Sequence, residues 1–378
     1  MRVFVESLLV QLLFTPYLAY VGGKALPSKG PWRMALYTLL GAEVLLYIVG
    51  YTCNSFLPDE VMSGIMQISG VYLMAVIYGG PLVIVIDILG RLDKKHHGRY
   101  ARLSERQAQN VRLGLFALVT AVVVFVVVQG DYNVRHPRIR HMELKTAKSD
   151  PQGKRGKLRI ALLTDTHISE SITYPIMKNV IQKTMAFKPD LILIGGDYID
   201  FTSNYAYKPD MMRAFTHDLH APLGKYYVLG NHEYRADMAK KKAWVGLTGG
   251  KLLIDEIAYP GDSLICLVGR DDKTNKHRMT MQEVTRKADR ALPVILLDHQ
   301  PNTMEELKAN GVDIALGGHT HAGQLWPMTW MVKLVFEDPF GLQQDGLHTN
   351  YISSGAGAAF PAYRIGSRSE IVIIDLIL

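Results

Sequence analysis

Residues 159–167 read RIALLTDTH, a short apolar run that ends in the polar cluster Asp165-Thr166-His167. Four later runs have the same form, since each is mainly apolar and is closed by Gly or Asp. They are Leu191 to Ile194, Tyr226 to Leu229, Val294 to Leu297 and Asp313 to Leu316. Runs of this kind predict buried strands of an α/β sheet. The polar clusters that follow them should therefore lie on loops at one edge of the sheet, where the sites of open α/β folds are built.

The side chains of these clusters are suited to binding a pair of divalent metal ions. Carboxylate, amide and imidazole donors bind Mn²⁺, Fe or Zn²⁺, and no thiolate accompanies them. Two ions about 3.5–4 Å apart can hold the attacking and leaving oxygens of a displacement at phosphorus. We expect Asp197 to bridge both ions, because it stands between two turns that contain glycine. The first ion would be completed by Asp165, His167 and His321, and the second by Asn231, His299 and His319.

In this order the clusters resemble the calcineurin-like metallophosphoesterase family, whose pattern is D-x-H, G-D, G-N-H-[DE], a lone His and G-H-x-H. The resemblance covers roughly Leu158 to Leu378. It implies a four-layer αββα sandwich and a metal-dependent phosphodiesterase or phosphatase with two divalent ions, Mn²⁺ being expected and Zn²⁺ or Fe the alternatives. It also implies that His232 donates a hydrogen bond or proton to the leaving-group or phosphoryl oxygen, and that Asn231 both binds metal and orients the phosphate.

Within that family the chain looks most like the bacterial membrane-associated branch. The residues that carry this likeness are Gly318 to Gln324, Gly269 to Asp272 and the tail from Ser353 to Gly366. One departure is Ala322, where a second glycine is commoner in the branch. A methyl group at this position could crowd the loop if φ is positive, although no ligand is lost.

Four apolar stretches precede residue 130, and each is about the 17–25 residues that a helix needs to cross a bilayer. They are residues 3–20, 34–51, 65–89 and 111–128. The first contains Glu6, Gln11 and Pro16 and could be the apolar part of a signal peptide. Because no small-residue cleavage site follows it, we expect a retained helix. The sequence thus predicts a transmembrane domain of about four helices, residues 1–130, and a catalytic domain, residues 131–378.

The distribution of Lys and Arg predicts how the helices are oriented. Seven basic residues lie between Arg91 and Arg112, whereas the connection from Thr52 to Gly64 has none. Because basic loops stay in the cytoplasm, we expect a multi-pass protein of the cell inner (plasma) membrane with an extracytoplasmic catalytic domain. Five basic residues from Arg135 to Lys148 argue the other way, but long domains are translocated largely regardless of charge. This basic run either holds the domain near anionic headgroups or is a solvated linker.

Three further features of the composition bear on function. Residues 91–112 alone have a net charge of +5, so the formal charge of +7 reflects the membrane half and no nucleic-acid partner is expected. Cys53 and Cys266 are predicted to be unpaired. Glu43 lies near the middle of the second span, where a carboxyl group is costly unless it faces a partner or a cavity. It belongs either to a lipid or proton pathway or to helix packing.

Two functions of different classes are compatible with these observations. The first is a membrane-anchored two-metal hydrolase that cleaves a phosphoester or pyrophosphate bond of a phosphorylated small molecule or a lipid. A membrane-tethered site favours lipid or envelope-associated substrates. The second is a phosphoesterase-like binding or assembly module without turnover. The presence of every ligand type together with His232 favours the enzyme, because a pure binding module has no evident need of that histidine.

Overall fold

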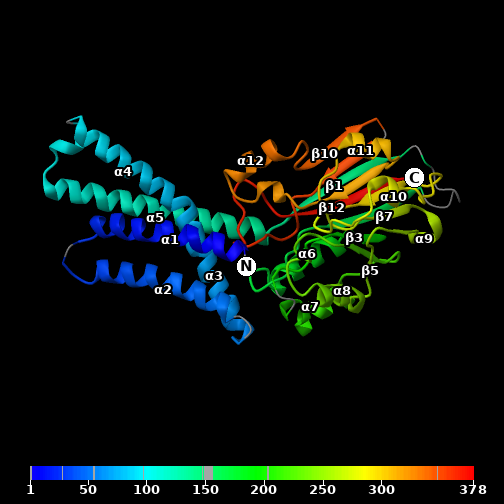
Figure 1. The fold of residues 1–378 in the computed structure, drawn as a ribbon, viewed down its shortest axis with the longest axis horizontal. Coiled ribbons are helices and arrows are strands. Elements are labelled where there is room, and N and C mark those ends of the chain that lie inside the picture. The colour runs from blue at the N-terminus through cyan, green and yellow to red at the C-terminus, as the bar shows by residue number, and fades with distance from the viewer. Residues whose placement is uncertain are drawn as a thin grey trace. The chain divides into compact units, whose positions relative to one another are not determined.

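The computed structural model describes residues 2–27, 29–53, 56–96, 98–146, 148, 156–201, 204–346 and 348–378. The chain divides into two compact units, Met1–Gly130 and Asp131–Leu378, which are drawn as a ribbon in Figure 1. The first is the helical unit and the second is the sandwich unit.

The described part of the helical unit is built from long apolar helices. They are α1 (Arg2–Ala25), α2 (Trp32–Thr52), α3 (Asp59–Met74), α4 (Gly80–Lys95) and α5 (Glu105–Arg135). A π-helical turn, η1 (Ala75–Gly79), joins α3 to α4, and a 3-10 turn, η2 (Tyr100–Arg102), precedes α5. Among the described residues, four helical stretches are long and apolar enough to cross a membrane: Val5–Ala25, Trp32–Thr52, Asp59–Lys95 and Glu105–Arg135. The prediction of an N-terminal region of apolar helices is therefore confirmed.

Polar side chains are also found inside the helical unit. Glu43 of α2 is buried, as are Gln11 of α1 and Ser69 of α3. A carboxyl group exposed to hydrocarbon would be costly. Glu43 is not exposed in this way, because its side chain is buried inside the helical unit. Cys53, at the end of α2, and Cys266 in the sandwich unit are both free.

The sandwich unit contains two six-stranded sheets. The first has the order β1 (Arg138–Lys145), β12 (Glu370–Ile377), β2 (Lys157–Leu163), β3 (Leu191–Gly195), β4 (Lys225–Val228) and β5 (Lys251–Leu252). Strands β2 to β5 are parallel, whereas β12 runs antiparallel to β2 and parallel to β1. The last strand of the chain is thus inserted between the first two, with Ile373 opposite Ala161.

The second sheet has the order β10 (Gly341–Asp345), β11 (His348–Ile352), β9 (Ile314–Gly317), β8 (Val294–Leu297), β7 (Cys266–Gly269) and β6 (Glu256–Ala258). Its four central strands are parallel, and the edge strands β10 and β6 are antiparallel to their neighbours. The predicted strand runs agree with β2, β3, β4, β8 and β9 to within two residues at each end.

Alternate residues of each central strand face opposite layers, which explains why these strands are apolar throughout. Ile160 of β2 enters the core between the two sheets, together with Ile295 of β8 and Leu316 of β9. Ala161 and Leu163 of β2 face the other way, into the core beneath the helices of the first sheet.

Helices cover the outer face of each sheet (Figure 1). Helices α6 (Tyr174–Met185), α7 (Pro209–Arg213) and α8 (Met238–Leu247) cover the first sheet. Helices α10 (Met281–Thr285) and α11 (Met304–Ala309) cover the second sheet. The shorter elements are α9 (Pro260–Ser263), α12 (Met328–Val335), η3 (Asn204–Tyr207), η4 (Ala214–Asp218) and η5 (His321–Gly323). The order helix, sheet, sheet, helix confirms the predicted four-layer sandwich.

Candidate metal centre

The loops that follow β2, β3, β4, β8 and β9 bring the predicted site residues together. Three groups of side chains lie close enough to share a metal ion: Asp165, His167 and His321; His167, Asp197 and His232; and Asp197, His299 and His319. His167 and Asp197 each belong to two groups, so the three groups form one continuous cluster. Asn231 joins it through its amide oxygen, which lies 2.9 Å from His319 Nδ1.

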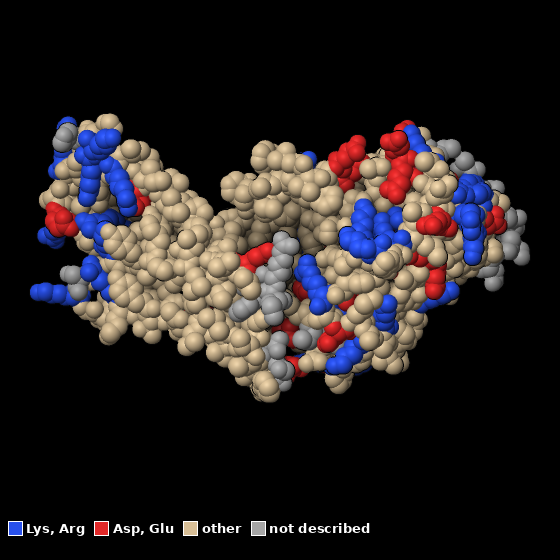
Figure 2. All heavy atoms as spheres, viewed as in Figure 1, with Lys and Arg blue, Asp and Glu red and all other residues tan. Residues whose placement is uncertain are grey.

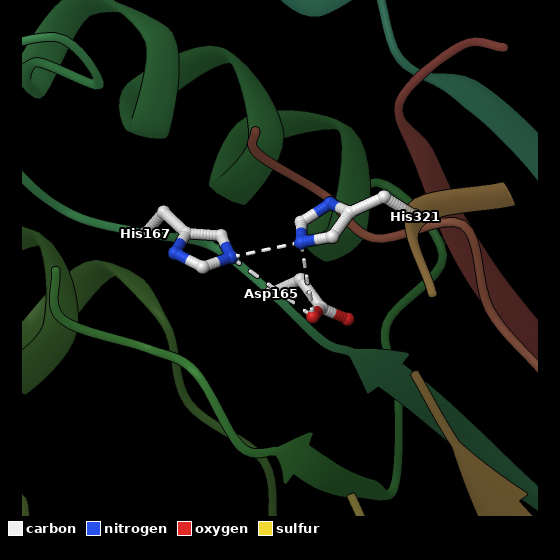
Figure 3. Close-up of side chains that lie close together, drawn as sticks. All are labelled: Asp165, His167 and His321. Atoms are coloured by element: carbon white, nitrogen blue, oxygen red, sulfur yellow. Dashed lines mark hydrogen bonds and ion pairs between the residues drawn. The ribbon is translucent and has the colours of Figure 1, made fainter. Parts of the chain in front are cut away.

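The first group combines one carboxylate with two imidazole rings (Figure 3). His167 Nε2 lies 3.0 Å from His321 Nε2. Asp165 Oδ1 lies 3.5 Å from the same atom of His321 and 4.0 Å from His167 Nε2. All three side chains are buried, so the electron pairs of two ring nitrogens and a carboxylate converge on one place that excludes most water.

Asp197 lies between the rings of His167 and His232 and the ring of His299. Its Oδ2 atom is 3.2 Å from His299 Nε2, 3.9 Å from His167 Nε2 and 3.9 Å from His232 Nε2. Burial alone would raise the pKa of Asp197, but His299, His232 and His167 outweigh it and hold that pKa well below its ordinary value. A carboxylate that stays ionised between two sets of imidazoles has the position needed to bridge two cations.

Asn231 adds an amide oxygen to the group that contains His299 and His319. The Asn231 oxygen lies 3.3 Å from His299 Nε2 as well as 2.9 Å from His319 Nδ1. An amide nitrogen in this place would donate hydrogen bonds to His319 Nδ1 and Asp197 Oδ2. An oxygen there instead adds one more electron pair to the cluster, which is the orientation that binds a metal ion.

The lowered pKa values of two histidines, His319 and His321, also fit metal binding. Burial, with a contribution from His299, lowers the pKa of His319 to about 4. Burial also lowers the pKa of His321 well below its ordinary value, and His167 and Arg364 add to the effect. Both rings are therefore neutral near pH 7 and keep a nitrogen lone pair for a cation. His299 differs, because the attraction of Asp197 outweighs burial and raises its pKa.

The backbone of the ligand loops has an unusual conformation. Five of the predicted ligands have positive φ in the left-handed region, which side chains other than glycine seldom adopt. They are Asp165 (51°), His167 (46°), Asp197 (50°), His319 (72°) and His321 (53°). Such conformations cost on the order of 1 kcal/mol each and persist where the surroundings enforce them, as at functional sites.

Two motif glycines allow the loops to approach one another. A Cβ atom on Gly318 would lie 2.1 Å from Asp165 Oδ2, and one on Gly230 would lie 2.2 Å from Asp197 Oδ1. Neither contact is sterically allowed, so the glycine before each ligand pair is required for the side chains to reach the cluster. Ala322 has a positive φ of 51°, so a residue with a methyl side chain does occupy a left-handed position in this loop.

Asp200 is a buried carboxylate of the site that was not predicted from the sequence. Its Oδ1 accepts a hydrogen bond from His232 Nδ1 at 2.6 Å, and its Oδ2 lies 3.5 Å from His167 Nδ1. The His232 ring is thereby held with Nε2 turned toward the cluster. The only sequence signal was proximity, since Asp200 follows Asp197 by three residues in the same loop.

Glu233 belongs to the G-N-H-E cluster, yet no role was predicted for it. Its carboxylate accepts hydrogen bonds from the backbone N–H groups of Asp197 at 2.9 Å and Gly230 at 2.8 Å. It also accepts from those of Tyr198 and Ile199. Burial and the charge of Asp197 raise the pKa of Glu233 to about 7, although the backbone donors oppose the shift. Glu233 therefore ties the loop after β3 to the loop after β4.

Arg364 supports the loop that carries His321. Its guanidinium is fully buried and donates hydrogen bonds to the carbonyl oxygens of Gly357 and His321 at 2.9 and 3.0 Å. Arg364 Nη2 also lies 3.1 Å from His321 Nδ1. The tail from Ser353 to Gly366, selected from the sequence only for its likeness to relatives, thus acts by positioning a predicted ligand.

Comparison with known proteins agrees with this architecture. Residues 158–323 match the model of the calcineurin-like phosphoesterase family. A transmembrane protein with metallophosphoesterase domain from Bos taurus is 30% identical over 377 residues, which cover 93% of this chain and 76% of the relative. A protein of the same description from Danio rerio is 28% identical over 94% of this chain and 83% of its own length. An uncharacterized metallophosphoesterase of Campylobacter jejuni is 29% identical over 78% of this chain and 75% of the relative.

Two stacked sheets with an Asp, Asn and His cluster at their strand ends define a metallophosphoesterase domain. The chain belongs to the calcineurin-like phosphoesterase family. Two of these relatives are described as transmembrane proteins, and this chain has apolar helices that are long enough to cross a membrane. The similarity extends to animal as well as bacterial proteins, so it is broader than the bacterial branch alone.

Proposed function

We propose that this protein is a membrane-anchored hydrolase that uses two divalent metal ions to cleave a phosphoester or pyrophosphate bond. The observation that carries the proposal is the position of Asp197 Oδ2, which lies 3.9 Å from His167 Nε2 on one side of the cluster and 3.2 Å from His299 Nε2 on the other. Metal ions bound at these groups would supply Lewis acidity and an activated water for attack at phosphorus.

In this proposal the ligand side chains would divide between two ions. Asp197 would bridge them, and the two remaining sets would be Asp165, His167 and His321 on one side and Asn231, His299 and His319 on the other. Oxygen and imidazole donors of this kind suit Mn²⁺, with Zn²⁺ or Fe as alternatives. Asn231 also lies where it can orient the phosphate group.

His232 donates a proton or hydrogen bond to the leaving-group or phosphoryl oxygen. Its Nδ1 is committed to Asp200 at 2.6 Å, while Nε2 faces the cluster 3.9 Å from Asp197 Oδ2. Burial opposes the charged imidazolium, but Asp197 and Asp200 raise the pKa of His232 above its ordinary value. The ring can therefore hold a proton beside the reacting phosphate.

The site is proposed to act on lipid or envelope-associated substrates outside the cytoplasm. A domain that continues directly from a membrane helix meets such substrates at high local concentration. Figure 2 shows that Lys and Arg of the helical unit gather at the end where the α1–α2 and α4–α5 connections lie. A shared basic end supports a cytoplasmic location for both connections, and the single span α5, which follows the α4–α5 connection, would then lead the sandwich unit outside.

The test uses the full-length chain purified in detergent. Its metal content and its hydrolysis of aryl phosphomonoesters and phosphodiesters are measured before chelation, after chelation and after return of Mn²⁺, Zn²⁺ or Fe²⁺. We expect about two ions per chain, loss of turnover on chelation and recovery with at least one metal. Asp197→Asn keeps the size of the side chain but removes its charge, and it should lose both metal and turnover. A wild-type chain that binds metal but hydrolyses neither ester would favour the binding module.

A further inference from the structure

Helix α12 (Met328–Val335) presents a continuous apolar surface to solvent. The exposed large apolar side chains of the helix, together with Trp326 just before it, form the α12 patch: Trp326, Met328, Trp330, Met331, Leu334 and Val335. Trp330 is 63% exposed and Leu334 is 71% exposed, and Lys333 is the one charged residue of the helix. Figure 2 shows the surface over α12 almost entirely without charged side chains. A gathered patch of this kind marks an interaction surface, whereas apolar residues exposed singly do not.

The α12 patch lies at the edge of the metal centre. The ring of Phe336, one residue past α12, meets the ring of His319 edge-on with centroids 6.1 Å apart. Thr320, between the two histidines of the last ligand loop, donates a hydrogen bond to the carbonyl oxygen of Pro339. The segment that carries the patch therefore packs directly on a ligand loop.

Hydrogen bonds also link the patch, through residues 364 and 365, to the last turn of α5. Asn133, in the last turn of α5, donates from Nδ2 to the carbonyl oxygen of Arg364 at 2.9 Å and accepts from the backbone N–H of Ser369 at 3.2 Å. The neighbouring Ile365 accepts from the backbone N–H of Trp326 at 2.8 Å. Asn133 is five residues past the expected end of the apolar span at Val128, about 7.5 Å along the helix.

We propose that the α12 patch is inserted into the boundary between the headgroups and the acyl chains of the lipid bilayer that the same chain spans. Resting on the proposed function, this assigns the substrate as a phosphoester lipid, whose acyl chains stay in the bilayer while its headgroup enters the metal centre. The composition fits this boundary, because Trp prefers it and a lysine beside apolar residues can extend its ammonium group to the headgroups. The bilayer is favoured over a second copy or another protein because the last turn of α5, just past the apolar span, contacts Arg364, and the next residue, Ile365, is hydrogen-bonded to Trp326 of the patch.

Fluorescence quenching tests the lipid contact without requiring activity. The full-length Trp32→Phe protein is placed in phosphatidylcholine vesicles with or without bromine on the upper part of the acyl chains. Three tryptophans then remain: Trp244, which is fully buried, and Trp326 and Trp330. We expect bromine to quench emission in this protein, and the quenching to disappear when Trp326→Phe and Trp330→Phe are added. Equal emission in both kinds of vesicle would overturn the proposal, and crosslinking between copies through residue 330 would assign the patch to self-association.

A second measurement addresses the substrate class. Two p-nitrophenyl phosphodiesters are compared, one with a hexadecyl chain embedded in vesicles and one with a soluble ethyl chain, so that the leaving group is the same. Leu334→Glu should reduce the ratio of lipid to soluble turnover on the order of tenfold, because a carboxylate is repelled from the apolar boundary. Leu247→Glu is the matched control, since Leu247 is 58% exposed on α8, away from the patch.

The outcomes separate the two proposals. If the wild-type protein hydrolyses neither diester and no aryl phosphomonoester, the proposed function fails, while quenching still decides whether α12 contacts lipid. If quenching is present but Leu334→Glu leaves the ratio of turnover unchanged, the assignment of a lipid substrate through α12 is overturned.

Discussion

His232 has one ring nitrogen held by a carboxylate and the other turned toward the candidate metal centre. We predict that His232→Ala retains the metal ions but loses about 10²–10⁴-fold in turnover, the usual effect of removing a general acid or base. The loss should be smaller for nitrophenyl esters than for alkyl esters, since a good leaving group needs little protonation. Turnover is measured against a series of leaving groups, and metal content is determined for each preparation.

The control for this variant is His217→Ala, because His217 is exposed in η4 and lies outside the cluster. An equal loss for good and poor leaving groups would contradict proton donation and leave His232 with phosphate binding alone.

Gly318 provides a second prediction at the residue scale. Gly318→Ala should lose most metal binding and turnover, because the added methyl group would lie 2.1 Å from Asp165 Oδ2 and must displace the ligand. Gly246→Ala is the matched control, since no atom lies within 4 Å of a Cβ at that position of α8. Replacing this helical glycine should raise the free energy of unfolding by up to about 1 kcal/mol. Metal content that stays normal in Gly318→Ala would show that the two loops can separate without losing the site.

The predicted site residues and the residues found only in the structure differ in one physical respect. The predicted ligands follow apolar runs at strand ends, so local sequence places each at an edge of a sheet. Asp200 and Arg364 act through contacts with histidines 32 and 43 residues away. The pattern of apolar and polar residues around Asp200 or Arg364 does not predict such a contact.

At the scale of elements, one buried carboxylate of β12 contacts side chains on both neighbouring strands. Asp375 accepts from Arg159 Nε at 2.7 Å and from Lys157 Nζ at 2.6 Å, both on β2, and lies 2.8 Å from His141 Nε2 on β1. We predict that Asp375→Asn lowers the free energy of unfolding by about 1–2 kcal/mol at pH 7, a modest effect because the partners are partly exposed. Denaturation of the full chain in detergent is followed by the fluorescence of buried Trp244.

The stabilisation that Asp375 provides should be lost at low pH. Burial would raise the pKa of this carboxyl, but Arg159, Lys157 and His141 outweigh burial and hold the pKa well below its ordinary value. Its stabilisation is therefore present above the unfolded-state pKa of about 3.9 and is lost as the pH falls through the lower folded-state value. The difference between wild type and Asp375→Asn should shrink below about pH 4. Asp345→Asn, 60% exposed at its side chain, should change stability by less than about 0.5 kcal/mol at any pH.

At the scale of the whole molecule, the sidedness of the helices would decide which substrates the proposed hydrolase meets. Seven Lys and Arg between residues 91 and 112, against none between 52 and 64, should keep the α4–α5 connection in the cytoplasm. A reporter that fluoresces only in the cytoplasm should therefore be bright when inserted near His97 and dark when fused after Leu378. An alkaline phosphatase fused after Leu378 should be active.

Removing the charge asymmetry provides the control for that assignment. Replacing the basic residues of the α4–α5 connection by glutamine should weaken or reverse the reporter pattern, because those charges resist translocation. A bright C-terminal fluorescent fusion in the unaltered chain would place the metal centre in the cytoplasm and make an extracytoplasmic lipid substrate untenable.

The sequence by itself determined the apolar helices, the central strands and the set of Asp, Asn and His side chains at the strand ends. These features are local, since each depends on the spacing of apolar and polar residues within one element. The tertiary structure alone decided how distant segments meet. Asp375 pairs with Arg159 across 216 residues, and β12 enters the sheet between β1 and β2. The exposure of α12 was decided in the same way, because an apolar helix is buried or exposed according to what packs against it.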